Sequence, residues 1–99
     1  MKDINESNKD EILKSGLVMV KFGADWCGPC KYQGRILETA DPKLPIYSCD
    51  VDSNPTWSNQ MKVTAIPLNV FFKNGKEISR HTGILTIDNI NKIFAENED

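Results

Sequence analysis

The sequence lacks a strong charge of either sign: among its 99 residues, 12 Lys and Arg stand against 14 Asp and Glu, for a net charge of -2. A nucleic-acid-binding domain normally carries a basic face, whereas the lysines here are scattered along the chain. A long hydrophobic run is also missing. The longest, residues 17–20, falls far short of the roughly 20 residues that a bilayer requires. We therefore expect neither a nucleic-acid partner nor a membrane span.

Cysteine is scarce, and the start of the chain is polar. Three cysteines are too few for a disulfide framework, and in a reducing compartment two of them at close spacing indicate redox chemistry or metal binding. Residues 1–7 contain no apolar core and no small-residue cleavage site, so we expect no signal peptide and a cytoplasmic location. The length predicts a single domain over residues 1–99 with one small core.

Apolar patterns and turn residues predict alternating helices and strands. Helices are expected from a capping box at Ser7 and Asp10 to Leu13, from Cys27–Pro29 to Asp41 with Ile36, Leu37 and Ala40 buried, from Asn54 to Met61, and after a Thr86 cap. Strands are expected at residues 17–22, 45–51, 68–72 and 77–82, with a short first strand at 1–4 and a hairpin turn at Asn74 and Gly75. This order predicts an α/β fold, with a mixed central sheet (parallel core, antiparallel C-terminal hairpin) flanked by helices on both faces.

The strongest chemical signal is Trp26–Lys31, in which Cys27 and Cys30 enclose Gly28 and Pro29 just after a buried strand. At the expected helix start, free backbone N–H groups favour the thiolate of Cys27, while Cys30 lies one turn further in and is more shielded. This asymmetry suits disulfide exchange, in which Cys27 attacks a substrate disulfide and Cys30 resolves the mixed disulfide.

Two other interpretations of the cysteines stay open. Zinc needs four ligands, and Cys27 and Cys30 could be completed only by Cys49 and His81, which lie singly in expected strands. The pair could also be simply packed thiols. For the remaining two residues we expect a buried, inert Cys49, with a regulatory thiol as the alternative, and a solvated surface position for His81. On balance the sequence predicts no metal site.

Several segments in the correct order resemble the thioredoxin family: residues 22–31, the active-site signature; 50–55, leading into the third helix; 63–67, facing the disulfide; and the hairpin at 71–76. Gly83 falls where the family has a glycine beside its substrate groove. The resemblance implies the thioredoxin fold and a protein-disulfide reductase. It also implies a cis peptide bond before Pro67 and an Ile66 backbone that pairs with an extended substrate segment.

The resemblance implies a substrate-binding surface at Trp26, Gly28, Pro29, Ile66, Pro67 and Gly83. Within it, Trp26, Ile66, Pro67 and Gly83 are expected to form a flat apolar patch around Cys27, although Trp26 alone could equally be a core residue. It also implies a monomer that binds no cofactor and receives electrons from NADPH through a separate flavin-dependent thioredoxin reductase, with disulfide-containing client proteins as substrates.

The direction of the reaction and the need for thiols each leave an alternative. Gly28 and Pro29 between the cysteines are the pair found in reductases of the family, whereas His before the second cysteine is typical of many oxidases and isomerases, where it stabilises the thiolate. A disulfide oxidant or isomerase on the same fold is therefore one alternative. The other is a thiol-independent accessory subunit that uses the apolar patch to clamp a larger enzyme.

Lys21 occupies the position where the family usually has a buried Asp that assists proton removal from the second cysteine, and Ser48 replaces the Lys that often partners it. A buried Lys has a lowered pKa and could act as a neutral base. It could also stay charged and lower a thiol pKa. A third interpretation is that the stem packs while the amine reaches water or a carboxylate. Lys21 is thus a candidate for modulating a thiol pKa.

Overall fold

The computed structural model describes residues 1–98 of the chain and contains every predicted element. In chain order these are β1 (Lys2–Asp3), α1 (Lys9–Leu13), β2 (Leu17–Gly23), α2 (Gly28–Thr39), β3 (Ile46–Asp50), α3 (Pro55–Gln60), β4 (Leu68–Lys73), β5 (Lys76–Thr82) and α4 (Ile87–Asn97). Within residues 1–98, no helix is long and apolar enough to cross a membrane.

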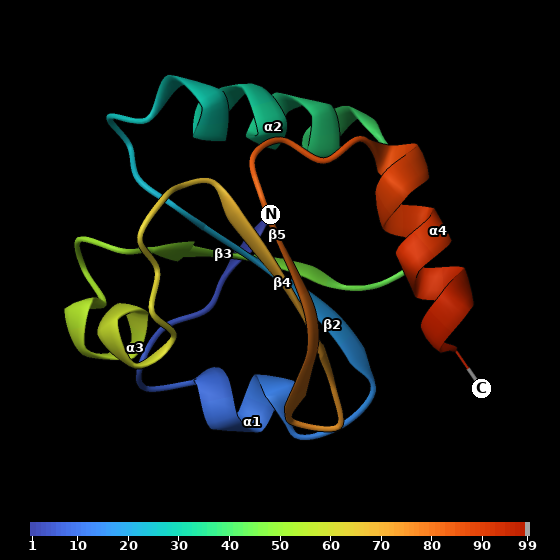
Figure 1. The fold of residues 1–99 in the computed structure, drawn as a ribbon, viewed down its shortest axis with the longest axis horizontal. Helices are drawn as coiled ribbons and strands as arrows, with labels where there is room; N and C mark the ends of the chain where they lie inside the picture. Colours follow the sequence, from blue (N-terminus) through green and yellow to red (C-terminus); the bar gives the residue numbers. More distant parts are fainter. Residues whose placement is uncertain (99) are drawn as a thin grey trace.

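The five strands form one mixed sheet in the order β1-β3-β2-β4-β5. Strands β1, β3 and β2 are parallel, and β4 and β5 are antiparallel to their neighbours. Helices α2 and α4 lie on one side of the sheet and α1 and α3 on the other (Figure 1). The predicted fold class is therefore confirmed, with β2 as the strand at which the sheet changes from parallel to antiparallel pairing.

Strand β2 packs against helices on both sides because its side chains alternate between two cores. Val18, Val20 and Phe22 join the cluster that contains residues of α1 and α3, whereas Met19 joins the cluster beneath α2 and α4. Every residue of β2 after Leu17 is buried. The segment that contains Cys27 and Cys30 follows this strand directly. Its first residue is therefore fixed in position by a buried strand.

Helix α2 buries a different face from the one predicted. Its buried residues are Cys30, Gln33 and Leu37, which follow the spacing of one helix face. Of the three predicted core residues only Leu37 is buried, and Ile36 and Ala40 are half-buried. The prediction considered only apolar side chains, whereas the polar side chain of Gln33 is fully buried.

Two turns and caps predicted from sequence are present. The Thr86 Oγ1 accepts a hydrogen bond from the Asn89 backbone N–H at 3.1 Å, which caps α4. Asn74 and Gly75 both have positive φ, at 53° and 85°. That combination is typical of the two-residue turn that matches the twist of a hairpin.

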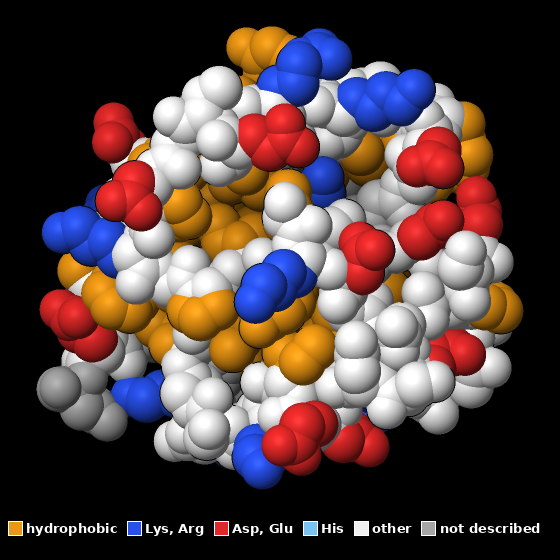
Figure 2. Space-filling model, turned by 180° about the vertical axis from the view of Figure 1, so that it is seen from behind, with side chains coloured by type: hydrophobic (Ala, Val, Ile, Leu, Met, Phe, Trp, Pro, Cys, Tyr) orange, Lys and Arg blue, Asp and Glu red, His pale blue; other side chains and the backbone are white. Residues whose placement is uncertain are grey.

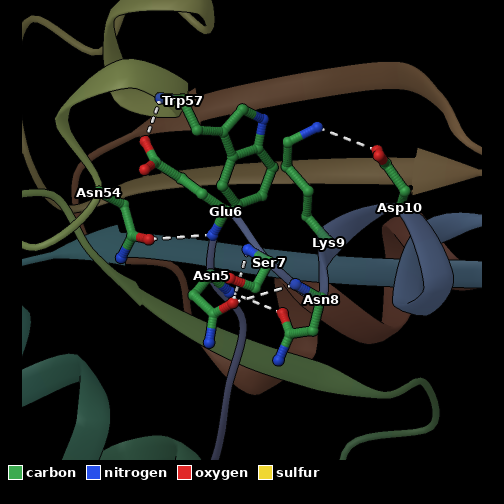
Figure 3. A network of polar contacts seen from close by, with 8 residues as sticks. All are labelled: Asn5, Glu6, Ser7, Asn8, Lys9, Asp10, Asn54 and Trp57. Atoms are coloured by element: carbon green, nitrogen blue, oxygen red, sulfur yellow. Dashed lines mark hydrogen bonds and ion pairs between the residues drawn. The ribbon is translucent and has the colours of Figure 1, made fainter.

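The capping box predicted at Ser7 and Asp10 is not formed. The N-cap residue of α1 is Asn8, and its side chain makes no capping hydrogen bond to the helix. Asn5 and Asn8 instead close the turn before the helix: the Asn5 Oδ1 accepts from the backbone N–H groups of Ser7 and Asn8, and the Asn8 Oδ1 accepts from the Asn5 backbone N–H at 2.7 Å (Figure 3). Asn favours such turns because its side chain bonds backbone groups close by in the chain.

The segment before α1 is tied to the start of α3 by two polar contacts. The Asn54 Oδ1 accepts from the Glu6 backbone N–H at 3.0 Å, and the Glu6 carboxylate accepts from the Trp57 backbone N–H at 2.7 Å (Figure 3). The Asn54 Nδ2 also donates to the Asp50 carbonyl at 2.9 Å. Asn54 thereby joins the N-terminal segment, the end of β3 and the start of α3.

The face shown in Figure 2 carries charges of both signs. Lys and Arg side chains are interspersed with Asp and Glu around a hydrophobic area that lies beneath helix α2. This distribution agrees with the small net charge of the chain. On this face the expectation of scattered rather than clustered basic residues is confirmed.

We predict that Asn54→Ala lowers the free energy of unfolding by about 1–3 kcal/mol, because it leaves partly buried backbone groups of Glu6 and Asp50 without their partner. Urea unfolding monitored by circular dichroism measures the change. Asn59→Ala is the matched control, since Asn59 is an exposed residue of α3 and its replacement should cost less than about 0.5 kcal/mol. Equal stability of the two variants would contradict the assignment.

Candidate active site

Cys27 and Cys30 form a disulfide at the junction of β2 and α2. Cys27 is the N-cap residue of α2, and its Sγ accepts a hydrogen bond from the Cys30 backbone N–H at 3.2 Å. The two residues are only 5% and 3% exposed. The predicted placement of the pair at a helix start is confirmed, with the first sulfur among the N–H groups that the helix leaves unpaired.

Close packing of β2 against α2 leaves little space at two glycines. A Cβ on Gly23 would lie 3.1 Å from the Cys30 Sγ, and a Cβ on Gly34 would lie 3.3 Å from the Lys21 Nζ. Both distances are tighter than ordinary carbon contacts. Glycine at 23 therefore makes room for the disulfide, and glycine at 34 makes room for the lysine amine.

The predicted cis peptide bond between Ile66 and Pro67 is present. The Ile66 carbonyl O lies 4.0 Å from the Cys27 Sγ, and the Ile66 side chain packs against Ala24 and the two cysteines. Pro67 itself is fully buried. The expectation that its ring contributes to an exposed apolar patch is therefore wrong, because Pro67 leads directly into β4, whose first five residues are buried.

The other predicted surface residues are exposed or half-buried. Trp26 is 71% exposed, which excludes the core alternative, and Gly28 and Pro29 are also exposed. Gly83 is half-buried with a φ of 95°, a conformation that favours glycine. Its backbone N–H donates to the Pro67 carbonyl at 2.8 Å. The cis-proline turn and the Gly83 segment are thus joined side by side.

Asp52 is a residue of this region that the sequence analysis did not single out. Its Oδ2 accepts a hydrogen bond at 2.8 Å from the Trp26 indole N–H, so the exposed ring has a fixed polar anchor. The two residues are separated by 26 positions in the chain, and no local pattern links them. The resemblance at residues 50–55 placed Asp52 only in the stretch that leads into the third helix.

Lys21 is buried, at 7% exposure, in a pocket of about 320 Å³ that it lines together with Cys30 and Glu38. Its Nζ donates to the Cys30 carbonyl at 3.3 Å. Burial lowers the pKa of Lys21 below its ordinary value, and the nearby Glu38 carboxylate partly opposes that shift. The burial on which both chemical interpretations of Lys21 depend is therefore present.

The zinc ligands considered from sequence do not come together. Within residues 1–98, no three His, Cys, Asp or Glu side chains are grouped as metal ligands. Cys49 packs in the core on the α1 and α3 side of the sheet, fully buried as expected. Burial, with the Asp50 carboxylate as the next contribution, raises the pKa of Cys49 to about 12. Its thiol is therefore inert at neutral pH.

His81 is less exposed than predicted. It is half-buried in β5, with its ring edge-on to Phe71 at a centroid distance of 5.8 Å. Its Nε2 lies 3.2 Å from the Ser79 Oγ. Packing on an aromatic ring explains why a residue of a charged strand is not simply solvated.

Known proteins resemble this chain over nearly its full length. The thioredoxin family profile matches residues 1–96. A thioredoxin of Chlamydia trachomatis serovar D is 36% identical over 98 residues, which is 96% of each chain. A thioredoxin of Staphylococcus haemolyticus is 35% identical over 95 residues, covering 92% of this chain and 91% of its own length.

Solved structures agree with these relatives. The crystal structure of chloroplastic thioredoxin z has a TM-score of 0.84 at 28% identity, covering 97% of this chain and 92% of its own. A mutant thioredoxin from Halobacterium salinarum NRC-1 has a TM-score of 0.87 at 22% identity, covering 100% and 90%, and shows the likeness of fold alone. The chain therefore belongs to the thioredoxin family, and it is a thiol–disulfide oxidoreductase of the protein-disulfide reductase type.

Proposed function

We propose that the chain carries electrons to disulfides of client proteins in the cytoplasm through Cys27 and Cys30. The observation that carries this proposal is the disulfide itself: it joins the N-cap of α2 to the first helical turn, beside the Ile66 carbonyl. A hydrogen-bond donor already points at the Cys27 sulfur, so a thiolate formed there on reduction would be stabilised.

The cycle has two exchange steps. The Cys27 thiolate attacks one sulfur of the client disulfide, which forms a mixed disulfide and releases the other client sulfur as a thiolate. Cys30 then loses its proton and attacks the Cys27 sulfur, which closes the Cys27–Cys30 disulfide and releases the second client thiolate. The client gains two electrons and the protein loses two. A flavin-dependent thioredoxin reductase, supplied by NADPH, returns two electrons to the disulfide, so this chain needs no bound cofactor.

Client recognition is assigned to the surface around Cys27. An extended client segment pairs with the Ile66 backbone, as a strand adds to a sheet edge. Exposed Trp26, Gly28 and Pro29 border one side of that segment, and Gly83 borders the other. Pro67 acts through the shape of its turn, since its ring is buried. Main-chain pairing of this kind suits many clients, and a monomer is sufficient for it.

Lys21 is assigned the removal of the Cys30 proton. A Cβ on Gly23 would meet both the Cys30 Sγ, at 3.1 Å, and the Lys21 Cε, at 4.0 Å, so the two side chains approach the same point. Burial lowers the pKa of Lys21, which favours the neutral amine more than at an exposed lysine. That amine accepts the Cys30 proton, and the Glu38 carboxylate then favours the resulting ammonium.

The roles of the two cysteines are tested by trapping. Cys30→Ser should accumulate a mixed disulfide with a disulfide-containing client, because the first step proceeds and the second cannot. Cys27→Ser should trap far less, since Cys30 is shielded. Mass spectrometry of the intact adducts measures both. A Cys27→Ser, Cys30→Ser double variant that retained full biological activity would instead support the thiol-independent accessory subunit.

The kinetic role of Lys21 has a separate test. Lys21→Met should slow release of the second client thiolate by about a hundredfold near neutral pH, as expected for loss of a proton acceptor. Stopped-flow measurement of a preformed mixed disulfide isolates this step. Lys21→Arg keeps the charge but cannot accept a proton, so a rate restored by Arg would favour charge over base catalysis. Lys31→Met, at an exposed position of the same pocket, is the control.

Burial of Lys21 also predicts how stability depends on pH. The folded pKa of Lys21 lies below its unfolded value of 10.5, so the unfolded state binds more protons between the two values and stability rises with pH there. In the disulfide form, Lys21→Met should be more stable than the natural sequence at neutral pH. The difference should shrink as pH rises toward 10.5, which urea unfolding across pH measures. A difference that is constant with pH would show that Lys21 titrates normally.

A further inference from the structure

A buried pair of amide side chains lies beneath the proposed groove. Gln33 of α2 and Asn69 of β4 are both 0% exposed. Each amide donates to the carbonyl oxygen of the other: Gln33 Nε2 to Asn69 Oδ1, and Asn69 Nδ2 to Gln33 Oε1 at 3.2 Å. Neither disulfide exchange nor proton removal uses these residues, although they are buried in the same layer as apolar Met19 and Phe71.

The pair also holds the backbone of the segment that follows β5. The Asn69 Nδ2 donates to the Gly83 carbonyl at 2.8 Å, and the Gln33 Oε1 accepts from the Leu85 backbone N–H at 3.2 Å. Within the same segment the Gly83 N–H bonds the Pro67 carbonyl. Residues 83–85 are therefore attached to the cis-proline turn directly, and to α2 and β4 through the two amides.

The positions of the two amides place them between three parts of the site. Gln33 lies three residues after Cys30 on the same helix, and Asn69 lies two residues after Pro67. Their hydrogen bonds therefore connect the helix that carries the disulfide, the strand that follows the cis-proline turn and the loop that carries Gly83. A buried side-chain amide lowers the stability of the fold unless all of its hydrogen-bond partners are present.

We infer that Gln33 and Asn69 are positioning residues, which hold residues 83–85 at the distance from the Ile66 backbone that an extended client segment requires. This inference rests on the proposed function. Gly83 is half-buried and Ile84 is 42% exposed, so the loop is at the surface. Without the amides its backbone groups can turn outward and exchange their protein partners for water. The side of the groove that Gly83 borders is then lost, while the disulfide and Lys21 stay in place.

The test separates recognition from stability by replacing both amides together. In Gln33→Met with Asn69→Leu, no buried side-chain amide is left unpaired, so the double variant should be about as stable as the natural sequence. Its half-saturating concentration for a peptide that carries a disulfide in an extended segment should rise about tenfold, with little change in the limiting rate. Hydroxyethyl disulfide, which is too small to pair with the groove, should be reduced at an unchanged rate.

Two further measurements make the outcome decisive. The Leu85 amide should exchange with solvent at least about tenfold faster in the double variant. Val18→Ala is the control for destabilisation, because Val18 packs in the core on the opposite face of the sheet. This variant should leave the half-saturating concentration for the peptide unchanged. Gln33→Met alone removes the hydrogen bond to Leu85 and keeps the one to Gly83. It should therefore give a smaller rise in the half-saturating concentration. This single variant is used instead if the double variant does not fold.

An unchanged half-saturating concentration, alongside faster Leu85 exchange, would overturn the inference and leave the proposed function intact. An equal loss with the peptide and with hydroxyethyl disulfide would also overturn it, because the amides would then support the disulfide itself. If the natural sequence reduced neither disulfide, the proposed function would fail first and the inference with it.

Discussion

The structure depends on how closely β2 approaches the first turn of α2. Gly23 ends the central strand directly against the Cys30 sulfur, where a Cβ would lie only 3.1 Å from that atom. Because β2 is held by a strand on each side and by helices on both faces, this contact fixes where α2 begins. Cys27 then becomes the N-cap, and its sulfur meets the Cys30 N–H. The position of the disulfide is therefore determined by the packing of β2 against α2, and not by the short segment between them.

Polar groups beneath α2 set the second constraint. Lys21, Gln33 and Asn69 are all buried on this side of the sheet, in a layer that also contains apolar Met19 and Phe71. Each has a protein partner: the Cys30 carbonyl for Lys21, and each other for the two amides. Burying them is tolerated only because these partners are present. These polar groups also bond the backbone of Cys30, Gly83 and Leu85. The buried polar layer therefore holds the backbone near the disulfide and in the loop after β5.

Much of the fold was predictable because it depends on patterns within a few neighbouring residues. Alternating apolar runs, the Asn74 and Gly75 turn and the Thr86 cap each act over a few residues, and all are present. Two pairings that were not predicted have a different cause. Gln33 and Asn69 look like surface residues until they meet across 36 positions of chain, and Trp26 meets Asp52 across 26. Pairings of this kind depend on the assembled sheet, so no window of sequence contains them.

The arrangement separates two tasks within one small core. In the proposed function, electron transfer uses the start of α2 and the pocket that holds Lys21, whereas recognition uses the cis-proline turn and the Gly83 loop. Both involve α2, since Cys30 forms half of the disulfide and Gln33, one turn further along, bonds the backbone of the loop. The partners of the amide pair include backbone groups of residues 83–85. Under the proposed function, changes at residues 33, 69 and 83–85 would therefore alter client preference without altering the chemistry of the thiols.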